Sequence, residues 1–243
     1  MRSTIIAVLW WAWAPVAAGA TSYTAVDLGT LGGSSTYGLA INASGWVTGA
    51  AYSDLAVHGL AFLWNGSSLQ NLGTLGGGGY SNGLAINASG WVTGWAYAGS
   101  GGYRAFLWNG SSLQDLGSLG GTYSRGLAIN ASGWVTGYAY TAGNAATHAF
   151  LWNGASLQDL GAFGGDYSLG SAINASGWVT GYAYTPGNAA THAFLWNGSS
   201  LQDLGTLGGT ISQGLAINAS GWVTGLAYTA ATPPMPFSGT VPA

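Results

Sequence analysis

The chain has 243 residues, of which only 4% are charged, against ~25% in an average globular protein. Beyond residue 20 the only cations are Arg104 and Arg125, so the chain lacks the basic patch that nucleic-acid binding requires, and we exclude that partner. Cysteine is absent, which excludes a disulfide framework. Frequent Trp, Tyr, Ile, Leu and Val argue against disorder. We expect a folded domain stabilised by packing alone.

Residues 1–20 have the three parts of a secretory signal. Arg2 gives a positive start, residues 5–14 form an apolar run, and residues 18–20 are the small residues of a cleavage site. An uncleaved membrane anchor is the alternative, but this run is shorter than the ~20 residues that span a bilayer. We expect a signal peptide over 1–20 and a single domain over 21–243. That domain is predicted to be extracellular or at the cell surface, with no membrane span after signal cleavage.

The rest of the chain is built from a repeat. The sequence Ile-Asn-Ala-Ser-Gly-Trp-Val-Thr-Gly recurs every 44 residues or so, a period typical of propellers, solenoids and arrays. It begins at Ile41, Ile86, Ile129, Ile173 and Ile217. In such architectures one repeat cannot bury its apolar face alone.

One repeat, over residues 120–161, predicts four short strands. They cover residues 123–130, 134–141, 148–152 and 156–160, and Gly-rich turns separate them. The second alternates with period two, and nothing has helical periodicity. Four antiparallel strands in ~40–45 residues are typical of a β-propeller blade, with a parallel β-helix as the main rival.

The two ends of the chain predict how the propeller closes. Residues 24–29 match the fourth strand of a repeat, while the last repeat lacks only that strand. We therefore predict an all-β, five-bladed β-propeller closed by the N-terminal strand, residues 23–28, pairing antiparallel with the strand around Phe237. The predicted blades cover approximately residues 34–73, 78–117, 122–161, 166–205, and 210–239 plus 22–28. The strand carrying Gly-Leu-Ala-Ile-Asn is expected to be innermost.

Three segments of the repeat resemble a known family. Residues 115–121, 128–137 and 148–152 together resemble the HAF repeat family of bacterial and archaeal extracellular proteins, which takes its name from the triplet His-Ala-Phe. The full triplet begins at His148 and His192. Two other repeats have Leu60 or Arg104 in place of the His, and the last repeat keeps only Phe237, preceded by Pro236. The resemblance covers almost all of the chain beyond residue 22. It implies secretion and a repeat architecture, and it implies no reaction.

The ionisable residues do not form a recognisable catalytic pattern. His148 and His192 occupy the same place in adjacent repeats, so a propeller holds them apart. Asp166 stands alone, whereas calcium sites need converging carboxylates. One series is expected to close Asx turns: Asp27, Asn71, Asp115, Asp159 and Asp203. We predict no catalytic residues, no cofactor and no metal. A glycoside hydrolase on a propeller scaffold ranks third among the alternatives, since its mechanism needs paired carboxylates and none are evident.

Two repeated features are candidates for contact with other molecules. Five Trp residues follow a turn and precede a Val, and we expect them to contact a glycan or another subunit, or to fill the gaps between blades: Trp46, Trp91, Trp134, Trp178 and Trp222. A second series is expected in the core: Trp64, Trp108, Trp152 and Trp196. Possible N-glycosylation sites are Asn42, Asn65, Asn87, Asn109, Asn130, Asn174, Asn197 and Asn218, although turns need Asn at the same places.

The sequence thus favours a secreted, non-enzymatic repeat protein that acts as an extracellular structural or adhesive module. Its expected partners are copies of itself, assembled into filaments, or cell-surface glycans. The alternative is a multivalent, lectin-like carbohydrate-binding propeller.

Overall fold

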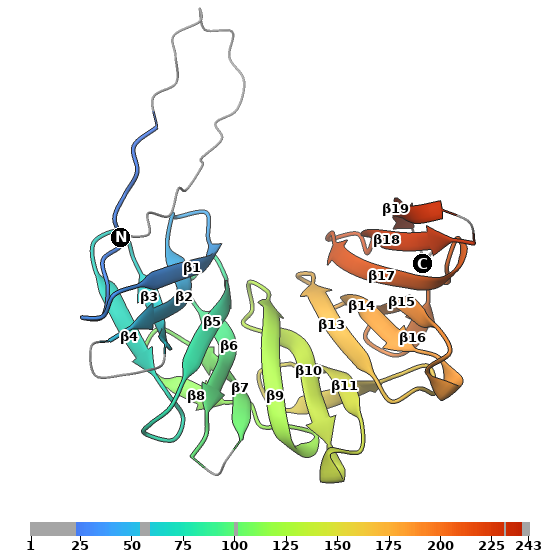
Figure 1. Ribbon diagram of the computed structural model, residues 1–243, viewed down its shortest axis with the longest axis horizontal. Helices are drawn as coiled ribbons and strands as arrows, with labels where there is room; N and C mark the ends of the chain where they lie inside the picture. The colour runs from blue at the N-terminus through green and yellow to red at the C-terminus, as the bar shows by residue number, and fades with distance from the viewer. Residues whose placement is uncertain (1–22, 54–58, 100–101, 231, 240–243) are drawn as a thin grey trace, which may run out of the picture.

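A computed structural model of the chain describes residues 23–53, 59–99, 102–230 and 232–239. The predicted signal peptide and His58 lie outside these residues. The strands follow one another as five antiparallel units, arranged along an open arc (Figure 1). No helix within the described ranges is long and apolar enough to cross a membrane.

Each of the first four units has four strands, and the last has three within the described residues. The first contains β1 (Thr36–Ile41), β2 (Val47–Tyr52), β3 (Gly59–Trp64) and β4 (Leu69–Gly73). The second contains β5 (Ser81–Ile86), β6 (Val92–Tyr97), β7 (Tyr103–Trp108) and β8 (Leu113–Asp115). The third contains β9 (Gly120–Ile129), β10 (Val135–Thr141), β11 (Thr147–Trp152) and β12 (Leu157–Gly161).

The fourth unit contains β13 (Ser168–Ile173), β14 (Val179–Tyr184), β15 (Thr191–Trp196) and β16 (Leu201–Asp203). The last contains β17 (Gly208–Ile217), β18 (Val223–Thr229) and β19 (Thr232–Gly239). Two short 3-10 helices, η1 (Ala142–Asn144) and η2 (Pro186–Asn188), join the second and third strands of the third and fourth units.

The predicted meander of four strands is confirmed, with one difference at the start of β9. The first strand of this repeat was expected to begin at residue 123, but it begins at Gly120. Its early part lies beside the third strand of the preceding unit, where Tyr103 and Tyr123 are parallel partners. Thr191 and Ile211 make the same link between β15 and β17. These links join the units into sheets of four, eight and seven strands.

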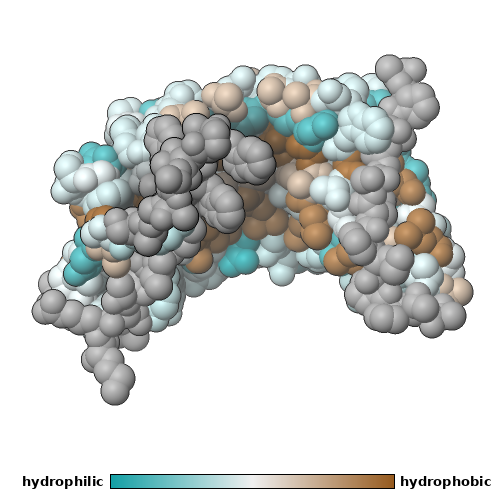
Figure 2. Space-filling model, turned by 90° about the horizontal axis from the view of Figure 1, so that it is seen from above, coloured by the Kyte–Doolittle hydropathy of each residue, from teal (hydrophilic) through white to brown (hydrophobic). Residues whose placement is uncertain are grey.

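The first strand of every unit lies on the inner side of the arc, as the small residues of Gly-Leu-Ala-Ile-Asn predicted (Figure 1). The next strand approaches it so closely that a Cβ on Gly137 would lie 1.9 Å from the carbonyl oxygen of Arg125. Any other residue here would therefore push the two strands apart. Seen from its open side, the arc has hydrophobic residues gathered in its hollow (Figure 2).

The hydrophobic core lies between units, and no single unit encloses it. In one cluster, Leu107 and Leu116 of the second unit pack with Val135, Phe150 and Trp152 of the third. The same arrangement recurs at the next contact, and Phe106, Phe150 and Phe194 are all fully buried. Burial of one such side chain contributes about 1.5–3 kcal/mol, so a unit without neighbours loses most of its stabilisation.

The predicted closure of the ring is not seen among the described residues. Residues 23–30 form no strand, and β19 pairs only with β18 among the described strands. The first and last units lie at opposite ends of the arc (Figure 1). The repeat spacing shows that the N-terminus has one strand more than whole repeats require and the last repeat one strand fewer. Whether the ring closes depends on the packing angle between units, which the spacing does not determine.

The N-terminal segment nevertheless lies where the fourth strand of a preceding unit would be. Leu28 and Leu31 pack against the first-unit core of Val47, Ala51 and Phe62. Between the first and second units, Leu72 and Leu75 occupy the same positions. The segment therefore covers part of the first unit without a strand beside it.

Candidate functional site

The Asn of each Asn-Ala-Ser-Gly-Trp turn holds its own turn and also binds the next unit. The Oδ1 of Asn130 accepts the backbone N–H groups of Ser132 and Trp134 at 3.0 and 2.9 Å. Its Nδ2 donates to the carbonyl oxygen of Asn174 in the following unit, at 3.1 Å. Both ends of the side-chain amide are thus satisfied, as burial of a polar group requires.

These hydrogen bonds form a ladder, which we call the Asn ladder, along the whole arc. It joins Asn42 to Asn87, Asn87 to Asn130, Asn130 to Asn174, and Asn174 to Asn218, always from the side chain of one unit to the backbone of the next. The ladder therefore has a direction, with different chemical groups at its two ends.

The repeated Trp side chains lie on the same contacts. A Cβ on Gly177 would lie 2.3 Å from the ring of Trp134, so this turn can hold only glycine while the ring keeps its place. The other Trp–Gly pairs are Trp46 with Gly90, Trp91 with Gly133, and Trp178 with Gly221. Four of the five candidate Trp residues thus contact the next unit. Trp222, in the last described unit, is 52% exposed.

A second contact between units was not predicted from the sequence. The backbone N–H of Ala149 in β11 donates to the Oγ of Ser168 in the next unit at 2.8 Å, and that hydroxyl donates to the carbonyl of Gly161. Ser81, Ser124 and Ser212 do the same elsewhere. The sequence signal for this contact was a hydroxyl residue two positions before the repeated glycine of each inner strand, which is Thr36 in the first unit.

The Asn ladder bears on the predicted glycosylation sites. Asn87, Asn130 and Asn174 are only 5–6% exposed, and their Nδ2 atoms are hydrogen-bonded across the contact. A glycan on these atoms does not fit the folded chain, so for these three the turn interpretation holds. Asn65 and Asn109 are exposed on hairpin turns, Asn197 and Asn42 are half-buried, and Asn218 is exposed.

The two histidines pair with the Asp residues of their own units. His148 Nδ1 lies 2.9 Å from Asp159 Oδ2, and His192 Nδ1 lies 2.8 Å from Asp203 Oδ2. Burial alone would raise the pKa of Asp159, but hydrogen bonds from His148 and from the N–H of Gly161 outweigh it and lower that pKa below its usual value. Sequence reasoning missed these pairs, which lie 11 residues apart across one hairpin.

The predicted Asx turns are confirmed in all five places. The side-chain Oδ1 accepts the N–H two residues later at Asp27, Asn71, Asp115, Asp159 and Asp203. These carboxylates are therefore structural. The described part of the chain holds no group of three or more His, Asp or Glu side chains that could bind a metal.

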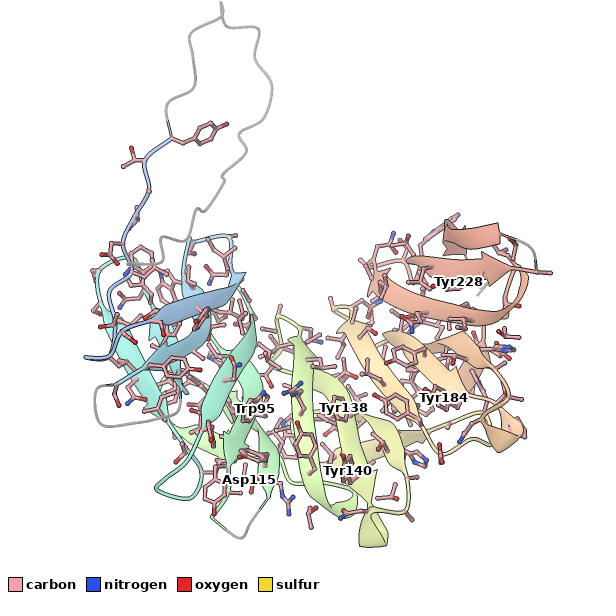
Figure 3. The ribbon with its side chains drawn as sticks, viewed as in Figure 1. Trp95, Asp115, Tyr138, Tyr140, Tyr184 and Tyr228 are labelled. Atoms are coloured by element: carbon pink, nitrogen blue, oxygen red, sulfur yellow. The ribbon has the colours of Figure 1, made fainter. Side chains whose placement is uncertain are left out.

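An aromatic cluster extends over the second and third units. Trp95 meets Tyr103 edge-on at 5.1 Å between centroids, and Arg125 lies 5.2 Å above the Trp95 ring. Tyr123 stacks on Tyr138, and its burial and the hydrogen bond to Tyr138 raise its pKa to about 12. Figure 3 shows that Trp95, Tyr138, Tyr184 and Tyr228 follow one another along the arc, each on the second strand of its unit.

Three buried polar atoms of this cluster have no hydrogen-bond partner among the described residues. They are Asn82 Oδ1, Trp95 Nε1 and Arg125 Nε. Asn82 and Trp95 are direct strand partners in β5 and β6. These three atoms are buried, so the part of the cluster that has the chemistry to contact a sugar is the half-buried Trp95 ring, through stacking.

Comparison with known proteins shows similarity of fold alone. No protein-family profile matches the chain, and no curated protein matches it. The structure of a putative TolB from Agrobacterium tumefaciens is similar, with a TM-score of 0.52 at 12% identity, over 77% of this chain and 67% of that one. The β-propeller domain of the Trilobed protease from Pyrococcus furiosus has a TM-score of 0.46 at 8% identity, over 66% of this chain and 51% of its own. The chain is all-β and has the fold of a β-propeller.

Proposed function

We propose that the protein is a secreted, non-enzymatic structural or adhesive module, in which the five units are five blades of a propeller-like array. The observation that carries the proposal is the contact between units, made four times with the same Asn, Trp, Gly and Ser residues. The residues that recur in every repeat hold neighbouring units together, as expected of a protein whose role is structural.

The absence of a catalytic arrangement in the described residues supports the same proposal. Each His–Asp pair is partly exposed and stands apart from the other, and the Asp also holds an Asx turn. General acid–base catalysis needs such a pair beside a third group and a place for the substrate. Within the described ranges, neither pair has a third ionisable partner.

Fractionation tests export and surface location. The full chain, expressed in a secreting host, is expected in the medium or on the cell surface with a new N-terminus near Thr21. A chain that starts at Thr21 behind an initiator Met is the control and is expected to stay inside the cell. Retention of the full, uncleaved chain inside the cell would contradict the proposal.

Glycan binding is the second candidate, and the aromatic cluster around Trp95 favours it. We propose this cluster as the glycan contact, because four of the repeated turn Trp residues are already packed on neighbouring units. Binding to immobilised polysaccharides is the test. Loss of binding in Trp95→Ala, with binding kept in Trp222→Ala, would place the site here. No binding by the unaltered protein would remove this candidate.

A further inference from the structure

The two ends of the arc carry the two halves of one contact. At the last unit, Trp222 has no glycine turn to pack against, and Asn218 Nδ2 has no acceptor among the described residues, although Asn218 forms the same turn as its equivalents. Thr224 is exposed there, whereas Thr48, Thr93, Thr136 and Thr180 are fully buried. This surface, defined by Asn218, Trp222 and Thr224, is called the tail face.

The first unit presents the complementary groups. A Cβ on Gly45 would have nothing within 4 Å, whereas the equivalent glycines of the next four units each lie against a Trp ring. The carbonyl of Asn42 accepts only the N–H of Gly45 among the described residues, while the carbonyl of Asn87 also accepts a side-chain amide. This surface, defined by Asn42, Gly45 and the N-terminal residues 24–31, is called the head face.

We propose that the tail face of one copy docks on the head face of a second copy and continues the Asn ladder from Asn218 to Asn42. In the same contact Trp222 packs on Gly45, as Trp178 packs on Gly221. This inference rests on the proposed structural function and names its partner. A head-to-tail contact of this kind builds a closed ring if its rotation closes, and a filament if it does not.

The strand β19 completes the contact. It is the last strand of its sheet, so one edge is free of any described strand. In the third and fourth units, the Phe of the third strand stands opposite the Asp of the Asx turn: Phe150 opposite Asp159 and Phe194 opposite Asp203. The same register places Phe237 opposite Asp27 of the second copy. Strand addition to a free edge is a common mode of protein association.

A second copy fits this contact better than the other end of the same chain. The four internal contacts repeat the same hydrogen bonds at 3.0–3.1 Å, and together they set the curvature of the arc. Five units with that curvature leave the first and last far apart (Figure 1). Closing one chain on itself would require at least one of these contacts to be remade.

The contact between copies differs from the internal ones at one position. In the internal contacts an Ala N–H donates to the hydroxyl of the next unit, as Ala193 does to Ser212. The register of β18 and β19 puts Pro236 at this place, opposite Leu226, and proline has no N–H to donate to Thr36. The contact therefore lacks one hydrogen bond, and association is expected to be reversible and to depend on concentration.

Two variants, each damaging one face, test the proposal. Trp222→Ala removes the ring of the tail face, and Gly45→Asn places a side chain where that ring must lie on the head face. Asn tolerates the φ of +79° at Gly45 better than other residues do. Gly66→Asn, at φ +96° with open space around it, is the matched control.

The mass of the purified chain without its signal is measured against concentration by analytical ultracentrifugation. The unaltered protein and Gly66→Asn are expected to assemble further as concentration rises. Trp222→Ala and Gly45→Asn should each weaken association on the order of 30-fold or more, as for a central Trp of an interface. Mixed in equal amounts, the two variants still share one intact pair of faces, so they should form dimers and stop there.

Every other outcome overturns the inference. A monomer at all concentrations, variants that assemble as the unaltered protein does, or a mixture that stays monomeric would each show that these faces do not join copies. Circular dichroism confirms that each variant is folded. Assembly is measured by ultracentrifugation and secretion by fractionation. Failure of this inference is therefore distinguished from failure of the proposed extracellular function.

Discussion

The contact between the fourth and last units and the free face of the last unit have nearly the same sequence but different surroundings. Asn174 is buried, while the equivalent Asn218 is exposed. Trp178 covers a glycine of the next unit, while Trp222 is 52% exposed. One repeated motif is therefore a structural element inside the arc and an open surface at its end. Substitutions at equivalent positions separate what the local turn contributes from what the contact contributes.

Loss of a core side chain inside the arc is expected to have the largest effect. Phe150 is fully buried between the second and third units, so Phe150→Ala should lower the free energy of unfolding by about 3–5 kcal/mol. Trp222→Ala in the exposed tail face should lower it by less than about 1 kcal/mol. Urea unfolding of dilute protein measures both, and equal losses would contradict the comparison.

The turn glycines give the sharpest matched pair. Gly177 and Gly45 have φ of +81° and +79°, so an Ala at either place carries the same backbone strain. Only at Gly177 does the new Cβ meet a Trp ring. Gly177→Ala should therefore be more destabilising than Gly45→Ala by about 1–3 kcal/mol, as for overpacking of a core. Thermal unfolding of the two variants measures this difference, and equal melting temperatures would contradict the prediction.

The Asn ladder is expected to have a smaller effect. Asn130→Ala removes the turn hydrogen bonds and the bond to Asn174, and leaves a buried carbonyl with one partner fewer. Asn218→Ala removes only the turn hydrogen bonds. The difference in unfolding free energy should be about 1 kcal/mol or somewhat more. If both variants lose the same stability, the cross-unit bond contributes nothing measurable.

Alkaline pH should weaken the middle of the arc. The pKa of Tyr123 is raised from 10.0 to about 12, so in the folded state it keeps its proton while the unfolded chain loses it. This contribution is complete below pH 10.0 and is lost as pH rises toward about 12. Tyr123→Phe should therefore flatten the decline of stability in this range. An unchanged slope, with unfolding followed by fluorescence, would argue against it.

Acid pH should give the smallest change. The pKa of Asp159 is below its usual 3.8 in the folded state, so its contribution is present above that value and is lost as pH falls through the folded pKa. Asp159→Asn should remove part of this dependence and keep the fold, because Asn71 holds the same turn in the first unit. The side chain is 43% exposed, so the effect is expected near the limit of detection in acid titration of unfolding.

The sequence by itself determined the repeating unit. The alternating run 134–141 and the Asx series predicted a strand and a set of turns correctly, because these features depend on residues close together in the chain. The offset between the chain ends was also readable, and Leu28 lies where that offset required. The inner position of the glycine-containing strand followed from the small size of its residues.

Only the tertiary structure decided how units meet. The Asn130 side chain reaches a carbonyl 44 residues away, and nothing in its local sequence distinguishes this bond from an ordinary turn. The sequence left open whether the ring of Trp134 contacts a glycan or another subunit or fills the gap between blades, and in the structure it packs on the turn of the next unit. Curvature, and hence the open arc, depends on the sum of such contacts over the whole chain. Each unit has almost the same sequence, so the difference between a buried contact and a free face is decided by position in the arc.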